Sequence, residues 1–138
     1  MAIESSLRTY LLTKSGITNL VSTRIYPLAR PQNSALPAIV YQRITGGHEH
    51  MIAGAAGNAN PVIQIDCLAA SYSAAKSVAE QVRQALQGYS GAMGSDTVHA
   101  CVFRNEIDLF EPPDDGSDVG VYRTVLDYAI RYVETIPS

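Results

Sequence analysis

The sequence predicts an α+β fold: a largely antiparallel sheet of four to five strands with helices packed on one face. Two observations support this prediction. Apolar residues recur at helical spacing near the N-terminus and again over 72–87, whereas β-branched and aromatic residues cluster in short runs elsewhere. The resulting order of helix, strand, strand, helix, strand, strand fits this fold class. The length of 138 residues is enough for one domain, 1–138, that buries its own core.

The N-terminal segment 3–14 is expected to form a helix, because its apolar residues share one helical face. Gly16 is expected to stop this helix, and Thr18 can cap a short second helical turn. A brief strand is expected at Ile25-Tyr26. It ends at Pro27, because proline fixes φ and has no backbone N–H.

The next two strands are expected at Ala38–Thr45 and Val62–Ala69, which are rich in β-branched and aromatic residues and are expected to pair. The segment 46–60 lies between them and contains four glycines and no clear period. It is expected to be a loop of about 15 residues. Loops of this length inside a compact domain tend to be functional or disordered.

The second long helix is expected over 72–87, with Ser71 as its N-cap and Gly88 as its C-terminal stop. One face is apolar, formed by Ala75, Val78, Ala79, Val82 and Leu86. The opposite face is polar and expected to face water, with Lys76, Glu80, Arg83, Gln84 and Gln87. The segment 89–97 has two glycines and two serines, and is expected to be a loop.

The last third of the chain is expected to form one long hairpin with an acidic tip at 112–119. The first arm is apolar on both faces from Val98 to Val102. From Phe103 it alternates, which predicts one face with Phe103, Ile107 and Leu109 and another with Arg104, Glu106 and Asp108. The second arm alternates in the same way over 121–132.

The register of this hairpin is predicted from charge. Pairing Asp108 with Arg123 also places Arg104 opposite Asp127 on the same face. The same register places Phe103 opposite Tyr128. A shift of two residues in one direction would set Glu106 against Asp127, a like-charge pair, and is therefore disfavoured.

Composition excludes several classes of function. The formal charge of −3 does not favour direct nucleic-acid binding, and no apolar run approaches the length of a membrane span. The N-terminus has no secretory-signal pattern.

Only 17% of the residues are charged, which is compatible with a surface partly covered by other subunits. Cys67 and Cys101 lie in apolar strand patterns and are expected to be buried, reduced thiols.

Three segments contain residue types that are common in catalytic or metal-binding sites. His48-Glu49-His50 resembles a metal-binding cluster, but the remaining candidate ligands lie in other elements. Ser90, between Gly88 and Ala92, resembles a nucleophile elbow, but a helix rather than a strand is expected before it. The acidic tip has the wrong spacing for a calcium loop, and no phosphate-binding motif is present. No catalytic residue, metal or cofactor is therefore expected.

Several segments carry a resemblance to a known family: Arg24-Ile25-Tyr26-Pro27, 36–44, 62–67, the helix 71–86, the run 105–112 and a final Tyr-Arg strand. Together they resemble the tail-completion proteins of long-tailed bacteriophages, the tail terminator or tail-to-head joining family. The resemblance implies a tail-terminator-like fold and a homo-oligomeric ring, usually a hexamer. Such a ring docks on the tail tube protein, stops tube polymerisation and offers a surface to the head–tail connector protein.

The resemblance also implies a location: the head-proximal end of the virion tail, after assembly in the cytoplasm of the host bacterium. DNA would pass through without specific binding, and no membrane is involved. The two polar loops are the expected docking elements. Their candidate interface residues are His48, Glu49, His50, Met51 and Ile52 in the first, and Asp114, Asp115 and Asp118 in the second.

Other functions stay open from the sequence. One is a small cytosolic hydrolase or metal-dependent enzyme that uses His48, Glu49 or Ser90. Another is a monomeric joining plug, or a neck protein of related fold.

Overall fold

The computed structural model describes residues 3–31, 35–45, 58–59, 61–94, 96–112 and 120–133. Within these ranges the chain forms three helices: α1 (Ile3–Leu12), α2 (Ser15–Val21) and α3 (Tyr72–Leu86). The same ranges contain the strands β1 (Ile25–Pro27), β2 (Ala38–Thr45), β3 (Asn58–Ala59), β4 (Val62–Ala69), β5 (Gly91–Met93), β6 (Asp96–Glu111) and β7 (Val121–Val133).

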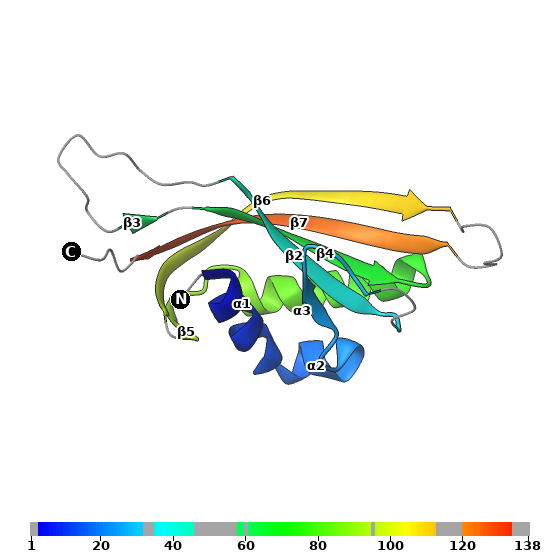
Figure 1. The fold of residues 1–138 in the computed structure, drawn as a ribbon, viewed down its shortest axis with the longest axis horizontal. Helices are drawn as coiled ribbons and strands as arrows, with labels where there is room; N and C mark the ends of the chain where they lie inside the picture. The colour runs from blue at the N-terminus through cyan, green and yellow to red at the C-terminus, as the bar shows by residue number, and fades with distance from the viewer. Residues whose placement is uncertain are drawn as a thin grey trace.

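The strands form one twisted sheet in the order β1-β2-β4-β7-β6-β5, and β3 pairs with β7 outside this order. All the pairs are antiparallel except β1 with β2, which is parallel. The three helices lie on one side of the sheet (Figure 1). The predicted α+β fold is thus confirmed, although the described sheet has seven strands rather than four to five.

The core lies between the helices and one face of the sheet. The apolar stripe predicted for α3 is confirmed, because all five of its residues are buried. The Ser71 side chain accepts a hydrogen bond from the backbone N–H of Ala74 at 3.2 Å, as its predicted capping role requires. Gly88, at φ 73°, follows the helix in the left-handed conformation that commonly ends helices.

The prediction that Gly16 ends the first helix is wrong. The helix α1 ends at Leu12, and Gly16 lies within α2, whose N-cap residue is Lys14 rather than Thr18. A Cβ on Gly16 would lie 2.1 Å from the side-chain oxygen of Gln81 on α3. This contact is with the flexible end of the Gln81 side chain, and it shows that Gly16 faces α3 from within α2.

Two segments predicted to be loops each contain a short strand. Within 46–60, Asn58 and Ala59 form β3 against the end of β7. Within 89–97, β5 pairs with the start of β6 in a tight hairpin, in which Gly94 has a φ of 56°. A Cβ on Gly94 would lie 2.8 Å from the Cα of Ser6, so both the turn and its contact with α1 require glycine.

The predicted hairpin of β6 and β7 is confirmed, but its register is right over only part of its length. Phe103 pairs with Tyr128, as predicted. Beyond this pair the predicted partners are wrong by one residue, because Asp108 pairs with Thr124 and Asp127 pairs with Asn105. Arg104 has no partner on β7 and forms a β-bulge, which places one extra residue on β6.

Candidate assembly surfaces

The bulge at Arg104 reverses the faces that were predicted for the second half of β6. Glu106 pairs with Leu126, a core residue on the helix side of β7, so Glu106 also lies on the helix side. Ile107 and Leu109 alternate with it and lie on the opposite side, which we call the open face. The sequence had predicted both residues on the same side as Phe103, and that prediction is wrong.

The acidic residues on the helix side are held by α3. The Lys76 ammonium lies 2.7 Å from a carboxylate oxygen of Glu106 and 2.7 Å from one of Asp108. Arg83 lies 3.7 Å from Glu106, and the Tyr72 hydroxyl donates to Asp108 at 3.0 Å. The Lys76 hydrogen bond is the main cause that lowers the pKa of Asp108, and its two carboxylate partners raise the pKa of Lys76. The α3 face predicted to be wet is therefore partly covered by β6.

The apolar residues on the open face are half exposed. Val102 is 47% exposed, and Ile107 and Leu109 are each 45% exposed. We call these three residues the β6 stripe. Five of the eight large apolar side chains that are exposed in the described part of the chain lie on β6. A cluster of this kind on one strand is a common property of protein interfaces.

The outer edge of β6 is also unpaired over most of its length. The strand β5 covers only Asp96 to Val98. From Ala100 to Glu111, no strand in the described ranges pairs with this side of β6. Such an edge presents backbone N–H and C=O groups that another strand can bind.

The opposite edge of the sheet is formed by β1 and β2. Because β1 pairs only with Ile39 to Tyr41, the outer side of β2 from residue 42 to 45 is uncovered by any described strand. Two exposed apolar side chains lie here: Leu28, just after β1, is 73% exposed, and Ile44 on β2 is 43% exposed. We call β1, residues 28–30 and the outer side of residues 42–45 the β1–β2 edge.

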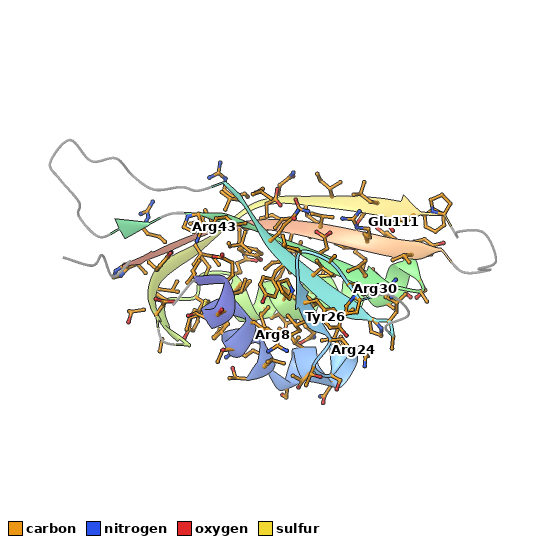
Figure 2. The ribbon with its side chains drawn as sticks, in the orientation of Figure 1. Arg8, Arg24, Tyr26, Arg30, Arg43 and Glu111 are labelled. Carbon is orange, nitrogen blue, oxygen red and sulfur yellow. The ribbon has the colours of Figure 1, made fainter. Side chains whose placement is uncertain are left out.

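Arginines surround the β1–β2 edge. The Arg8 side chain donates to the carbonyl oxygen of Ile25 at 2.9 Å, and Arg24 donates to that of Pro37 at 2.8 Å. Figure 2 shows Arg8, Arg24 and Arg30 around β1, with Glu111 at the end of β6. These arginines fix the backbone of the short edge strand while they add positive charge to it.

Charge is divided unevenly along the chain. Residues 1–45 contain five basic side chains and one acidic side chain, a formal charge of +4. Residues 96–133, which contain the β6–β7 hairpin and its tip, have three arginines and eight acidic side chains, a formal charge of −5. The two segments that contribute the edges of the sheet therefore have opposite formal charge.

A polar network crosses the open face near the end of the hairpin. Arg123 forms ion pairs with Asp66 and with Glu111, the latter at 3.0 Å. Gln64 donates to Asp66 at 3.0 Å. Burial, and then the charge of Asp66, raise the pKa of Asp127. A shallow hollow of about 270 Å³ lies over this network, between Leu28 and Glu111. Its charged groups pair mainly with one another, which indicates a structural role.

The predicted interface residues cannot be placed on these surfaces. His48, Glu49, His50, Met51, Ile52, Asp114, Asp115 and Asp118 all lie outside the described residues. The sequence did not point to the β6 stripe, because its alternation gave no sign of the bulge. Several hydrophilic residues around 104–106 were the available signal, since bulges are common at sheet edges.

The residues weighed for chemistry give no active-site geometry in the described part of the chain. Ser90 is exposed in the turn between α3 and β5, so a helix precedes it and the strand–turn–helix context of a nucleophile elbow is absent there. Within the described ranges, no group of three metal-ligating side chains comes together and no helix is long and apolar enough to cross a membrane. Cys67 and Cys101 are buried free thiols, as predicted, and burial raises the pKa of Cys101 to about 11.

Comparison with known proteins decides the family. The sequence profile of the family described as "Tail completion protein gp17" matches residues 5–133. The chain belongs to the tail completion protein gp17 family. This finding confirms the resemblance drawn from the sequence. A tail completion protein is a structural component of a virion tail and not an enzyme, so the hydrolase and metalloenzyme alternatives are set aside.

A solved structure has the same fold as this tail completion protein. A chain from the structure entitled "Virion of native gene transfer agent (GTA) particle" superposes with a TM-score of 0.68. The match covers 96% of this chain and 95% of that chain, at 19% sequence identity. No curated protein matches the sequence.

Proposed function

We propose that this tail completion protein acts as a single domain that closes the head-proximal end of the tail tube as a ring of six copies. The ring ends polymerisation of the tube protein and joins the tail to the head–tail connector protein. The observation that carries the proposal is family membership over nearly the whole chain, combined with a sheet whose two edges are exposed and unlike each other.

A closed ring requires two different surfaces on every subunit. In a head-to-tail contact, one surface of a subunit binds a different surface of the next, and the series closes when the rotation is right. The β6 stripe and the β1–β2 edge are two such surfaces. Six copies would together carry a formal charge of −18, which would repel the DNA phosphates and favour passage of DNA without specific binding.

Docking to a tube on one side and a connector on the other requires two further surfaces. The segment 46–57 leaves the sheet near Ala129 of β7, because Thr45 pairs with Val62 and Val62 pairs with Ala129. The tip 113–119 leaves it next to Val121, at the other end of β7. At about 3.3 Å per residue, these two points are roughly 26 Å apart. We therefore assign the two docking contacts to these two segments, which contain the candidate residues His48 to Ile52 and Asp114 to Asp118.

Particles made without this protein test the proposal. Electron microscopy should show tails of irregular, excessive length and heads that are not attached to tails. Complementation with the intact protein should restore both features. Tails of normal length with unattached heads would instead indicate a neck protein. Normal particles would contradict the proposal altogether.

A further inference from the structure

We infer that neighbouring subunits of the ring meet through the two edges of the sheet, with the outer edge of β6 of one copy against the β1–β2 edge of the next. The inference rests on the proposed ring and assigns its subunit contact. It places the β6 stripe of one copy beside Ile44 and Leu28 of its neighbour.

The first argument is the position of the exposed apolar side chains. Ile44 is exposed at the β2 edge, where it is the extra residue of a β-bulge between Arg43 and Thr45. Ile107 and Leu109 are exposed on the open face at the opposite edge. If the sheet continues from one copy to the next, these exposed apolar side chains come close to one another and are covered by the contact.

The second argument is the unpaired backbone. The β6 edge offers twelve residues, 100–111, that no described strand pairs with on the outer side. The β1–β2 edge offers a shorter free segment at residues 42–45. Strand addition would satisfy backbone groups at both edges with one contact. It would also cover edges that could otherwise pair with strands of unrelated proteins.

The third argument is charge. The β1–β2 edge belongs to the segment with a formal charge of +4, and the β6 edge belongs to the hairpin with a formal charge of −5. A head-to-tail contact brings two segments of opposite formal charge together. A two-fold contact between two β6 edges would bring two acidic hairpins together, which is unfavourable. The charges therefore favour a second copy in head-to-tail orientation as the occupant of the β6 edge.

Pairs of introduced cysteines test this contact. Ile44→Cys is combined in one chain with Val102→Cys or with Ile107→Cys, and purified tails are treated with a flexible bismaleimide linker. Two positions on β6 are used because the register between copies is not assumed. We expect a ladder of covalent oligomers, up to the full ring, on a denaturing gel.

Three controls distinguish cross-links across the head-to-tail contact from other cross-links. Each single-cysteine variant should give no ladder, because a head-to-tail contact does not bring two identical residues together. The matched pair Ile44→Cys with Thr97→Cys should also give none, because Thr97 is exposed on the same strand but lies where β5 already covers the edge. The wild-type chain should not react, because Cys67 is fully buried and Cys101 is only 4% exposed.

The inference is overturned if neither β6 position gives a ladder with Ile44→Cys. It is also overturned if Ile107→Cys alone links to itself, which indicates a two-fold contact, or links to the tube protein. A wrong subunit contact can be distinguished from a wrong function by comparing the gel with particles that lack the protein. If no ladder forms but particles without the protein still have overlong tails, the contact is wrong and the function stands. If those particles are normal, the function is wrong whatever the gel shows.

Discussion

Two buried tyrosines show how differently a hydroxyl group is accommodated in this core. The Tyr10 hydroxyl donates to the carbonyl oxygen of Ala85 at 2.6 Å and ties α1 to α3. The Tyr128 hydroxyl is fully buried, and no described residue forms a hydrogen bond with it. Burial is the main cause that raises the pKa of each tyrosine to about 12. The two residues therefore differ in hydrogen bonding rather than in exposure to water.

We expect opposite results when each of these hydroxyl groups is removed. Tyr128→Phe should leave the free energy of unfolding unchanged or increase it, because no hydrogen bond is lost and an unpaired polar group is removed. Tyr10→Phe should lower it by about 1 kcal/mol, because the Ala85 carbonyl loses its partner. Urea unfolding of the two variants checks this. The assignment of hydrogen bonds is wrong if Tyr128→Phe is the more destabilised.

The Lys76 contacts predict how stability depends on pH. The pKa of Asp108 is lowered in the folded state from its ordinary value of 3.8. Its contribution is therefore present above pH 3.8 and is lost as the pH falls through the lowered value. Lys76 stays protonated throughout this range, because its own pKa is raised.

We therefore expect the wild-type melting temperature to fall on acidification from about pH 5 to pH 3 more steeply than that of Lys76→Met. Gln84→Met, on the exposed face of the same helix, is the control and should follow the wild type. Equal slopes for all three proteins would show that the contacts with β6 do not contribute measurably. Differential scanning fluorimetry across this pH range is sufficient.

At the scale of elements, the bulge in β6 determines what the hairpin presents to its surroundings. One extra residue, Arg104, moves the charged side chains of the second half of the strand towards α3 and the apolar ones to the open face. A regular strand would do the reverse. The arrangement is stable because Lys76 and Arg83 lie where they can neutralise the inward carboxylates.

Deletion of Arg104 should therefore be tolerated. The flanking residues Phe103 and Asn105 already pair with the adjacent residues Tyr128 and Asp127, so the deletion leaves every other pair in place. We expect a change in stability of at most about 1 kcal/mol, near the typical effect of a single change. Deletion of Thr124 is the control. It lies on central β7, paired on both sides, so it should destabilise strongly. Equal loss in the two variants would refute the bulge assignment.

The elements that the sequence predicted well are those whose pattern reflects their own burial. The helix α3 and the strands β2 and β4 each have a pattern that their contacts with the core explain. The misses have a different origin. Gly16 lies within α2, where it faces Gln81 of α3, and β5 depends on a turn at Gly94 against Ser6. The faces of β6 depend on one bulge. Each depends on a partner distant in sequence, which local periodicity cannot show.

At the scale of the whole molecule, the sheet separates four surfaces. Its two edges differ in charge and are assigned to neighbouring copies, while the segments at the two ends of β7 are assigned to the tube and the connector. The helices cover one face of the sheet, and the open face lies on the other side (Figure 1). We therefore expect a subunit to be able to lose one contact without losing the others.

Replacement of residues 46–60 by Asn-Gly tests that division. Turns of this kind connect antiparallel strands, and the new turn joins Thr45 to the segment that begins at Pro61, next to its partner Val62. Only the two residues of β3 are lost from the sheet, so the melting temperature should stay close to that of the wild type. The cysteine ladder should also persist, because the edges are untouched. Attachment of heads to tails should be lost, and titres of infectious particles measure this. Wild-type titres would show that the segment is a passive connection.

We propose that six copies close the head-proximal end of the tail through contacts between unlike edges of the sheet. Electron cryomicroscopy of the head–tail junction would show such a ring in place. We expect one ring of six copies between tube and connector, with Ile107 and Leu109 of each copy buried against the β1–β2 edge of the next. A single copy at this position, a ring at the other end of the tail, or a β6 edge exposed to solvent would contradict the claim.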